Sequence, residues 1–130
     1  MYETITRGIR IAVEPDYQED QSEPEEGRYV WSYTVRIANE SGETVRLRTR
    51  TWRIVDAAGR ARTIRGSGVG GEEPLILPGE TFVYTSGAPL ASPSGLMLGS
   101  YGMETASGEA FEADVPAFSL DSPHDLRWTH

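Results

Sequence analysis

Hydrophobic and polar side chains alternate along several short stretches of this chain. The clearest alternation covers residues 29–38, whose odd positions are Tyr29, Trp31, Tyr33, Val35 and Ile37. A repeat of two places every second side chain on the same face of a β-strand. We therefore predict a strand here with its odd-numbered face in the core.

Six further stretches have strand character and are separated by residues typical of turns. They cover residues 5–13, 45–55, 62–65, 81–85, 96–104 and 110–118. Residues 105–109 have the length and the glycine of a hairpin connection. No window long enough for a helix has apolar residues at helical spacing without Gly or Pro. The pattern predicts an all-β fold of about seven antiparallel strands, and favours a two-sheet sandwich over a barrel.

Two segments lack this alternation. Residues 14–27 are acidic, with two prolines, and are expected to form a mobile, solvated loop because they have little apolar surface to bury. After Leu120 the pattern ends. We expect one domain over residues 1–120 and a loosely ordered tail over residues 121–130.

Composition narrows the function. The 130 residues suit a single domain, and the net charge of −8 repels phosphate backbones and anionic membranes. We therefore expect no nucleic-acid or membrane partner. The chain has no cysteine, and all twelve of its basic residues are arginine, which excludes thiolate chemistry, P-loops and Schiff bases. Its start lacks the pattern of a secretory signal, so a cytoplasmic location is expected.

A glycine cluster covers residues 66–71 and has the spacing of a dinucleotide-binding fingerprint. That fingerprint needs a helix to follow, because the pyrophosphate binds at the helix N-terminus. Here Glu72, Glu73 and Pro74 follow instead. We favour a loop that needs glycine for positive φ angles. The alternative is a small-anion or nucleotide site formed by Arg65, Gly66, Ser67, Gly68 and Gly71.

Arginines crowd residues 46–65. A repeat of two places Arg46, Arg48 and Arg50 on one strand face with Trp52. The simpler interpretation is a solvated face whose arginines pair with glutamates on neighbouring strands. The functional interpretation is a partner-binding surface formed by Arg46, Arg48, Arg50 and Trp52.

Catalytic and metal-binding patterns are sparse. His124 and His130 both follow the last predicted strand, so no strand holds a histidine next to a serine nucleophile. No pair of histidines has metal-binding spacing. We expect no enzyme activity, no resident metal and no cofactor.

Several motifs together give a family resemblance over nearly the whole chain. They include Tyr29-Val30-Trp31, Gly66-Ser67-Gly68-Val69-Gly70-Gly71-Glu72, Leu77-Pro78-Gly79-Glu80, Tyr84-Thr85-Ser86-Gly87 and Gly99-Ser100-Tyr101. In this order they resemble the bacterial ApaG proteins. The resemblance implies an immunoglobulin or fibronectin-III-like β-sandwich, a domain also appended to some eukaryotic F-box and polymerase-interacting proteins. It further implies a link to cobalt resistance and magnesium efflux, without an established activity.

The sequence as a whole predicts a non-catalytic binding module. The expected partner is a protein, which remains unidentified, and the alternative is a small anion or nucleotide at the glycine cluster. An unprotected sheet edge also allows two copies to pair, so the chain is expected to be a monomer or a weak homodimer.

Overall fold

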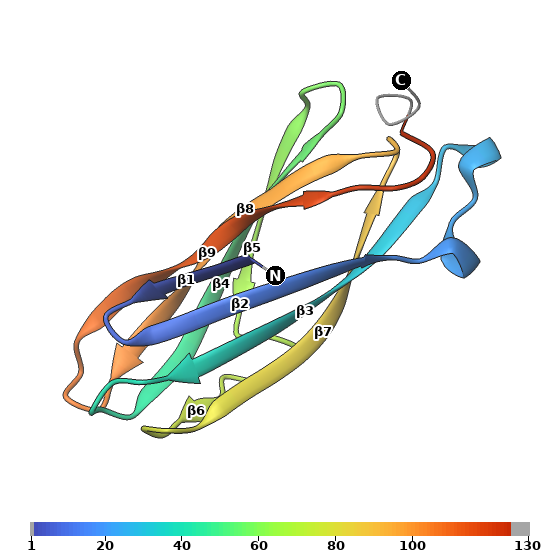
Figure 1. Ribbon diagram of the computed structural model, residues 1–130. Coiled ribbons are helices and arrows are strands. Elements are labelled where there is room, and N and C mark those ends of the chain that lie inside the picture. The colour runs from blue at the N-terminus through green and yellow to red at the C-terminus, as the bar shows by residue number, and fades with distance from the viewer. Residues whose placement is uncertain (1, 126–130) are drawn as a thin grey trace.

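A computed structural model describes residues 2–125 of the chain as two antiparallel sheets that face each other (Figure 1). The first sheet has the order β1-β2-β3-β7, and its strands are β1 (Tyr2–Thr6), β2 (Ile9–Tyr17), β3 (Tyr29–Asn39) and β7 (Thr81–Leu90). The second has the order β5-β4-β8-β9, with β4 (Val45–Asp56), β5 (Ala61–Ser67), β8 (Gly95–Thr105) and β9 (Ala110–Leu120). A short strand, β6 (Leu75–Ile76), pairs with the start of β4.

The predicted all-β sandwich is confirmed, but residues 2–125 form nine strands rather than about seven. The single opening strand expected over residues 5–13 is a hairpin of β1 and β2. Its turn contains Arg7 and Gly8, which both have positive φ angles, of 48° and 82°. Alternation continues on both sides of that turn, so hydrophobic spacing alone did not reveal it. The ninth strand, β6, is too short to show a repeat.

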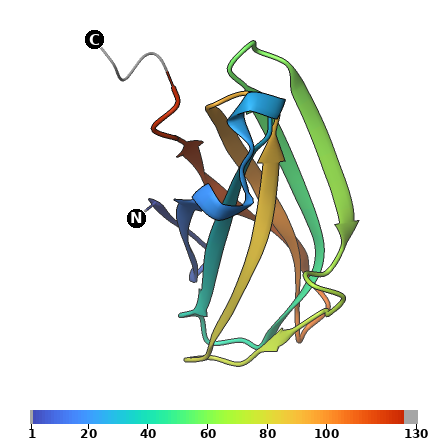
Figure 2. The same ribbon diagram turned by 90° about the vertical axis from the view of Figure 1, so that its right-hand side faces the viewer.

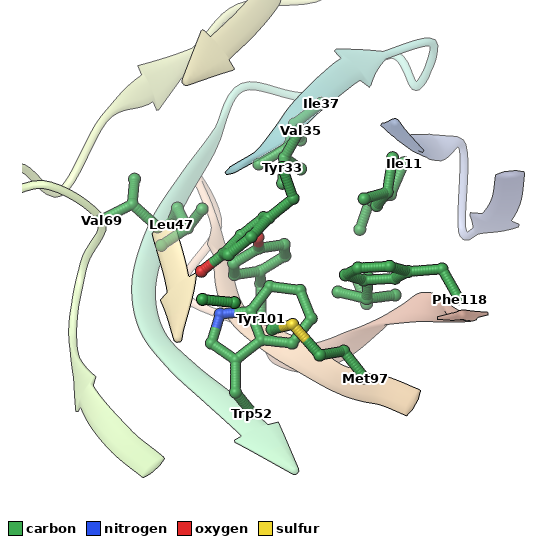
Figure 3. Packing of buried hydrophobic residues seen from close by; sticks show 14 of the residues in the cluster. Ile11, Tyr33, Val35, Ile37, Leu47, Trp52, Val69, Met97, Tyr101 and Phe118 are labelled. Atoms are coloured by element: carbon green, nitrogen blue, oxygen red, sulfur yellow. The ribbon is translucent and has the colours of Figure 1, made fainter. Parts of the chain in front are cut away.

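The odd-numbered face of β3 forms the centre of the core, as predicted. Trp31, Tyr33, Val35 and Ile37 are at most 6% exposed. Aromatic rings from both sheets meet there edge to face: Trp52 contacts Tyr33, Tyr101 and Phe118 at centroid distances of 5.4–6.0 Å (Figure 3). Such ring contacts add about 0.5–1.5 kcal/mol each to the burial of apolar area.

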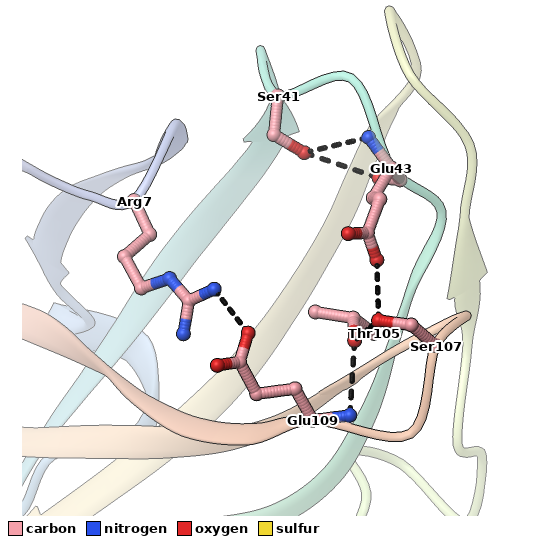
Figure 4. A network of polar contacts seen from close by, with 6 residues as sticks. All are labelled: Arg7, Ser41, Glu43, Thr105, Ser107 and Glu109. Atoms are coloured by element: carbon pink, nitrogen blue, oxygen red, sulfur yellow. Dashed lines mark hydrogen bonds and ion pairs between the residues drawn. The ribbon is translucent and has the colours of Figure 1, made fainter.

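Three turns at one end of the sandwich are joined by polar contacts (Figure 4). Arg7 of the β1–β2 turn forms an ion pair with Glu109 of the β8–β9 turn. Glu43, between β3 and β4, accepts a hydrogen bond of 3.2 Å from Ser107. The two sheets are thereby connected at their shared end.

The acidic segment between β2 and β3 contains two single-turn 3-10 helices, η1 (Glu19–Gln21) and η2 (Pro24–Glu26). The Ser22 hydroxyl donates to the carbonyl of Gln18 and accepts from the amide of Val30. From the other end of the chain, His124 lies against this segment, 3.3 Å from a carboxylate oxygen of Glu19. The indole of Trp31 also donates to the carbonyl of Asp121. Residues 121–125 thus lie along the sandwich.

The two sides of the sandwich differ. On one side the edge strands β1 and β9 meet, and Thr4 donates a hydrogen bond of 2.6 Å to the carbonyl of Asp114. On the other side, β5 ends the second sheet and β7 ends the first (Figure 2). The sandwich is therefore closed at β1 and β9. It is more open between β5 and β7, where the Arg62 side chain donates a hydrogen bond of 3.3 Å to the carbonyl of Pro89.

Candidate functional site

A pocket of about 330 Å³ lies at the open side, between β7, β4 and the glycine-rich turn. Its polar lining comes from both sheets and consists of Tyr33, Arg50, Trp52, Tyr84, Thr85 and Ser86. The turn contributes Val69, Gly70 and Gly71. The pocket combines one arginine of the predicted stripe with part of the predicted glycine cluster, two features that are separate in the sequence.

A β-bulge at Arg48 determines which arginine faces the pocket. The pairing of β4 with β8 shifts by one residue between Leu47 and Thr49. One extra residue exchanges the two faces of the strand downstream of it. Arg50 therefore shares the inward face with Trp52, whereas Arg46 and Arg48 point outward. The predicted four-residue stripe, which assumed a repeat of two throughout, is divided by the bulge.

The two outward arginines have different partners: Arg48 forms ion pairs with glutamate side chains, and Arg46 bonds to the backbone. Arg48 lies 3.2 Å from a carboxylate oxygen of Glu73 and 3.7 Å from one of Glu104. Arg46 donates a hydrogen bond to the carbonyl oxygen of Glu73. Trp52 is 3% exposed and belongs to the core, so its ring does not contribute to this outer surface.

Arg50 is held in the pocket by the backbone of the glycine-rich segment. Its Nη1 donates hydrogen bonds of 2.9 Å to the carbonyls of both Ser67 and Gly68. Gly66 is opposite Arg50 in the β4–β5 ladder, and a Cβ at that position would lie 2.8 Å from the guanidinium carbon. The first glycine of the cluster therefore provides space for a side chain of the same protein.

The other predicted anion-site residues are divided between two faces. Arg65 is paired with Thr51, and directly paired residues have side chains on the same face of a sheet. Arg65 thus points outward, away from the pocket. Gly66 and Ser67 lie in β5, whereas Gly68, Gly70 and Gly71 have positive φ angles of 57–82° in the turn that follows. The next element is β6, so no helix follows the glycines.

Three tyrosine hydroxyls surround the pocket and the core behind it. Tyr84 and Tyr101 share a hydrogen bond. Burial raises the pKa of Tyr84, and it raises the pKa of Tyr101 and Tyr33 as well. The charge of Arg50 lowers the pKa of each of the three tyrosines, but the increase caused by burial is larger. The hydroxyls consequently keep their protons and remain hydrogen-bond donors at neutral pH.

The indole N–H of Trp52 is buried and makes no hydrogen bond of acceptable geometry. It interacts with the Tyr84 hydroxyl closely enough to lower the pKa of that group, against the larger effect of burial. Figure 3 shows the indole nitrogen and the Tyr33 hydroxyl on the same side of the core, toward Val69. Buried donors are nearly always paired, so this N–H, whose contact with the Tyr84 hydroxyl is poorly aligned, is available to an acceptor in the pocket.

Sequence reasoning missed Tyr33, Tyr84 and Ser86 as pocket residues. The alternation correctly predicted their strands, but no local signal places a β3 side chain beside a β7 side chain and a bulged β4 arginine. Within residues 2–125, no group of three or more His, Asp or Glu side chains is arranged to hold a metal ion. No helix in that range is long and apolar enough to cross a membrane. His130 lies outside the described residues.

Comparison with known proteins confirms the family resemblance. The family model described as the ApaG domain matches residues 19–105. Protein ApaG from Rhodospirillum centenum is 63% identical over 124 residues, which is 95% of each chain. Protein ApaG from Parvibaculum lavamentivorans is 61% identical over the whole length of both chains. A crystal structure of an ApaA protein from Bordetella pertussis is 41% identical and superposes with a TM-score of 0.86, over 89% of this chain and 94% of that one.

Proposed function

This chain belongs to the ApaG family, and on that premise we propose that it is a cytoplasmic, non-catalytic binding module for a protein partner. The partner adds an extended segment to the free edge of β5. The observation that carries this proposal is that β5 ends its sheet on the open side of the sandwich, with every residue except Gly66 exposed. Addition of a strand to an exposed edge is a common mode of peptide recognition.

The hydrogen-bond pattern identifies the groups that receive the partner. The Asp56 amide donates to the Arg60 carbonyl, and the Gly68 amide donates to the Arg48 carbonyl. In an antiparallel ladder hydrogen-bonded pairs alternate, so the even-numbered residues of β5 bond to β4. The backbone groups of Ala61, Thr63, Arg65 and Ser67 then face the free edge. Four residues of an open edge can hold a short strand.

The charge of this edge indicates an acidic partner. Arg60, Arg62 and Arg65 lie along it, and residues 59–71 contain no acid. The rest of this protein is acidic, with a net charge of −8. Arginines on an edge also hinder pairing with a second basic edge. A segment with alternating acidic side chains matches both the hydrogen-bonding groups and the charge.

The test compares two substitutions at Thr63, whose amide faces the free edge. Thr63→Pro removes that donor and leaves the ladder to β4 in place, because proline is tolerated at an edge position whose N–H faces solvent. Thr63→Val keeps the donor. Partners captured at native expression with the wild-type protein and each variant are identified. Hydrogen exchange is then measured on the purified complex.

We expect slower exchange of residues 61–67 in the complex, retention of the partner by Thr63→Val and its loss from Thr63→Pro. A partner that binds Thr63→Pro as well as wild type, or that protects another surface, contradicts the proposal. So does a homodimer that Thr63→Pro abolishes, because a second copy would then occupy the edge.

The proposal extends to the link with cobalt resistance and magnesium efflux. We expect this phenotype to depend on the partner that binds the β5 edge. A strain lacking the gene is complemented with wild type, Thr63→Val or Thr63→Pro and challenged with Co²⁺. We expect only Thr63→Pro to fail. Equal complementation by all three proteins separates the metal phenotype from the β5 edge.

A further inference from the structure

Arg50 has no acidic partner among residues 2–125. The ion pairs of residues 2–125 involve Arg7, Arg10, Arg48 and His124, and none of them involves Arg50. Its guanidinium is partly buried between the core tyrosines and the glycine-rich turn. Partial removal of a positive charge from water is unfavourable without a counter-charge nearby. The pocket therefore favours an anion.

The guanidinium also has hydrogen-bonding capacity to spare. Only Nη1 donates to the protein, to the two carbonyls of Ser67 and Gly68. These bonds orient the group and leave the Nε and Nη2 donors without a partner among residues 2–125. An arginine held in this way presents the planar fork that binds a carboxylate or phosphoryl group through two parallel hydrogen bonds.

Other donors lie around the same space. The Trp52 indole N–H is buried at the pocket and meets no acceptor of good geometry among residues 2–125, although it interacts with the Tyr84 hydroxyl. Tyr33, Tyr84 and Ser86 line it as well. The Tyr84 hydroxyl shares a hydrogen bond with Tyr101 and the Tyr33 hydroxyl interacts with Ser86, and burial keeps the two phenols of the lining protonated. None of the described residues that line the pocket is acidic. A fixed positive charge surrounded by neutral donors is the arrangement expected for an anionic oxygen group.

The size of the pocket limits the ligand. Gly70 and Gly71 are part of its lining, and a Cβ at either position would meet nothing within 4 Å. A volume of about 330 Å³ is at the small end of ligand pockets. The pocket suits a compact anion rather than a dinucleotide.

We propose that this pocket binds a compact oxyanion, a carboxylate or phosphoryl group of a small molecule, whose charge lies against Arg50 and which accepts a hydrogen bond from Trp52. The site is distinct from the outward-facing Arg65 and from the free edge of β5. The oxyanion proposal can therefore be tested independently of the protein partner proposed above.

The test follows the indole N–H of Trp52 by nuclear magnetic resonance. The chain has three tryptophans, and Trp52→Phe identifies the cross-peak of this one. Inorganic phosphate, pyrophosphate and citrate are added in turn, with chloride at matched ionic strength as the control. The variants are Arg50→Gln and Arg50→Lys, and Arg65→Gln is the matched control on the outer face of the neighbouring strand.

We expect at least one oxyanion to shift the Trp52 cross-peak saturably while chloride does not. Arg50→Gln should weaken that affinity about tenfold or more, since a hydrogen-bonded charge is lost, whereas Arg65→Gln should leave it unchanged. If Arg50→Gln does not fold, Arg50→Lys keeps the positive charge but removes the planar guanidinium. This variant should also bind the oxyanion more weakly than wild type. Two results would overturn the proposal. One is that none of the three oxyanions shifts the cross-peak saturably. The other is that the variant at Arg50 changes the oxyanion affinity no more than Arg65→Gln does. The oxyanion that binds distinguishes phosphoryl from carboxylate ligands.

Discussion

Arg50 and Gly66 are paired across β4 and β5, and the guanidinium of Arg50 occupies the space where a side chain at residue 66 would lie. Their proximity links two features of the sequence, the arginine-rich strand and the glycine cluster. Gly66 has an ordinary strand conformation, so its contribution is space rather than a positive φ angle. The glycines that follow it have a different role.

Gly66→Ala should displace the Arg50 guanidinium and lower the free energy of unfolding by about 0.5–1 kcal/mol, because the hydrogen bonds to Ser67 and Gly68 are weakened while strand propensity improves. Gly42→Ala is the control, since Gly42 has no positive φ angle and a methyl group added there would meet no atom within 4 Å. It should change stability by less than about 0.5 kcal/mol. Urea unfolding measures both, and equal values would show that Arg50 is not held by this contact.

Gly68→Ala should be more harmful than Gly70→Ala, although both residues have φ angles near 58°. A Cβ at residue 68 would lie 1.9 Å from the backbone oxygen of Glu72, which accepts the amide of Val69. At residue 70 nothing lies within 4 Å. We expect losses of about 3–4 and about 1–2 kcal/mol, the smaller one being the conformational cost alone. Thermal unfolding with similar losses for both would contradict the turn geometry.

Arg48→Gln should have little effect on stability. The carboxylates of Glu73 and Glu104 lie 3.2 and 3.7 Å away, and all three side chains are 42–51% exposed. Exposed pairs contribute about 0–1 kcal/mol and are screened by salt. Urea unfolding at low and high ionic strength should show the small difference disappearing as salt rises. A loss that persists at high salt would indicate a packing role instead.

Asn39→Ala should be among the most destabilising polar substitutions. The side chain is 1% exposed, and its Nδ2 donates to the carbonyls of Glu43 and Ile76 at 2.7 and 2.9 Å. Its Oδ1 accepts from the amide and hydroxyl of Ser41. We expect a loss of about 2–4 kcal/mol, since buried carbonyls are left unpaired. Ser41→Ala, which removes one donor at a more exposed position, should cost less in the same assay.

Stability should fall steeply in alkali. Burial raises the pKa of Tyr84 and Tyr101 above the ordinary value of 10.0, so the unfolded chain releases these protons at lower pH than the native protein. The stabilisation that these protonated tyrosines give the folded protein is complete below pH 10. As pH rises above 10, the free energy of unfolding falls by about 1.4 kcal/mol per pH unit for each tyrosine. Urea unfolding across this range should show a smaller slope for Tyr84→Phe than for wild type. An unchanged slope would mean that Tyr84 ionises normally in the folded protein.

Alternation of side chains is a local property, and it was enough to predict the sandwich and its core. Tyr33, Val35 and Ile37 lie inward because burying their apolar area outweighs any other arrangement of that strand. The family motifs indicated the same sandwich architecture, but they did not identify a binding site. The hairpin at Arg7 and Gly8 was missed because its two strands continue one pattern of spacing.

The pocket depended on pairing between distant strands. Whether Arg50 faces the core or the solvent is decided by the bulge at Arg48, which exists only because β4 pairs with β8. One residue inserted in a ladder reverses every face after it, and a repeat read from the sequence does not include the partner strand. The sequence by itself determined two layers of strands with an aromatic core. Only the tertiary structure decided that Arg50 lies beside Trp52, that Arg65 points away, and that β5 remains open.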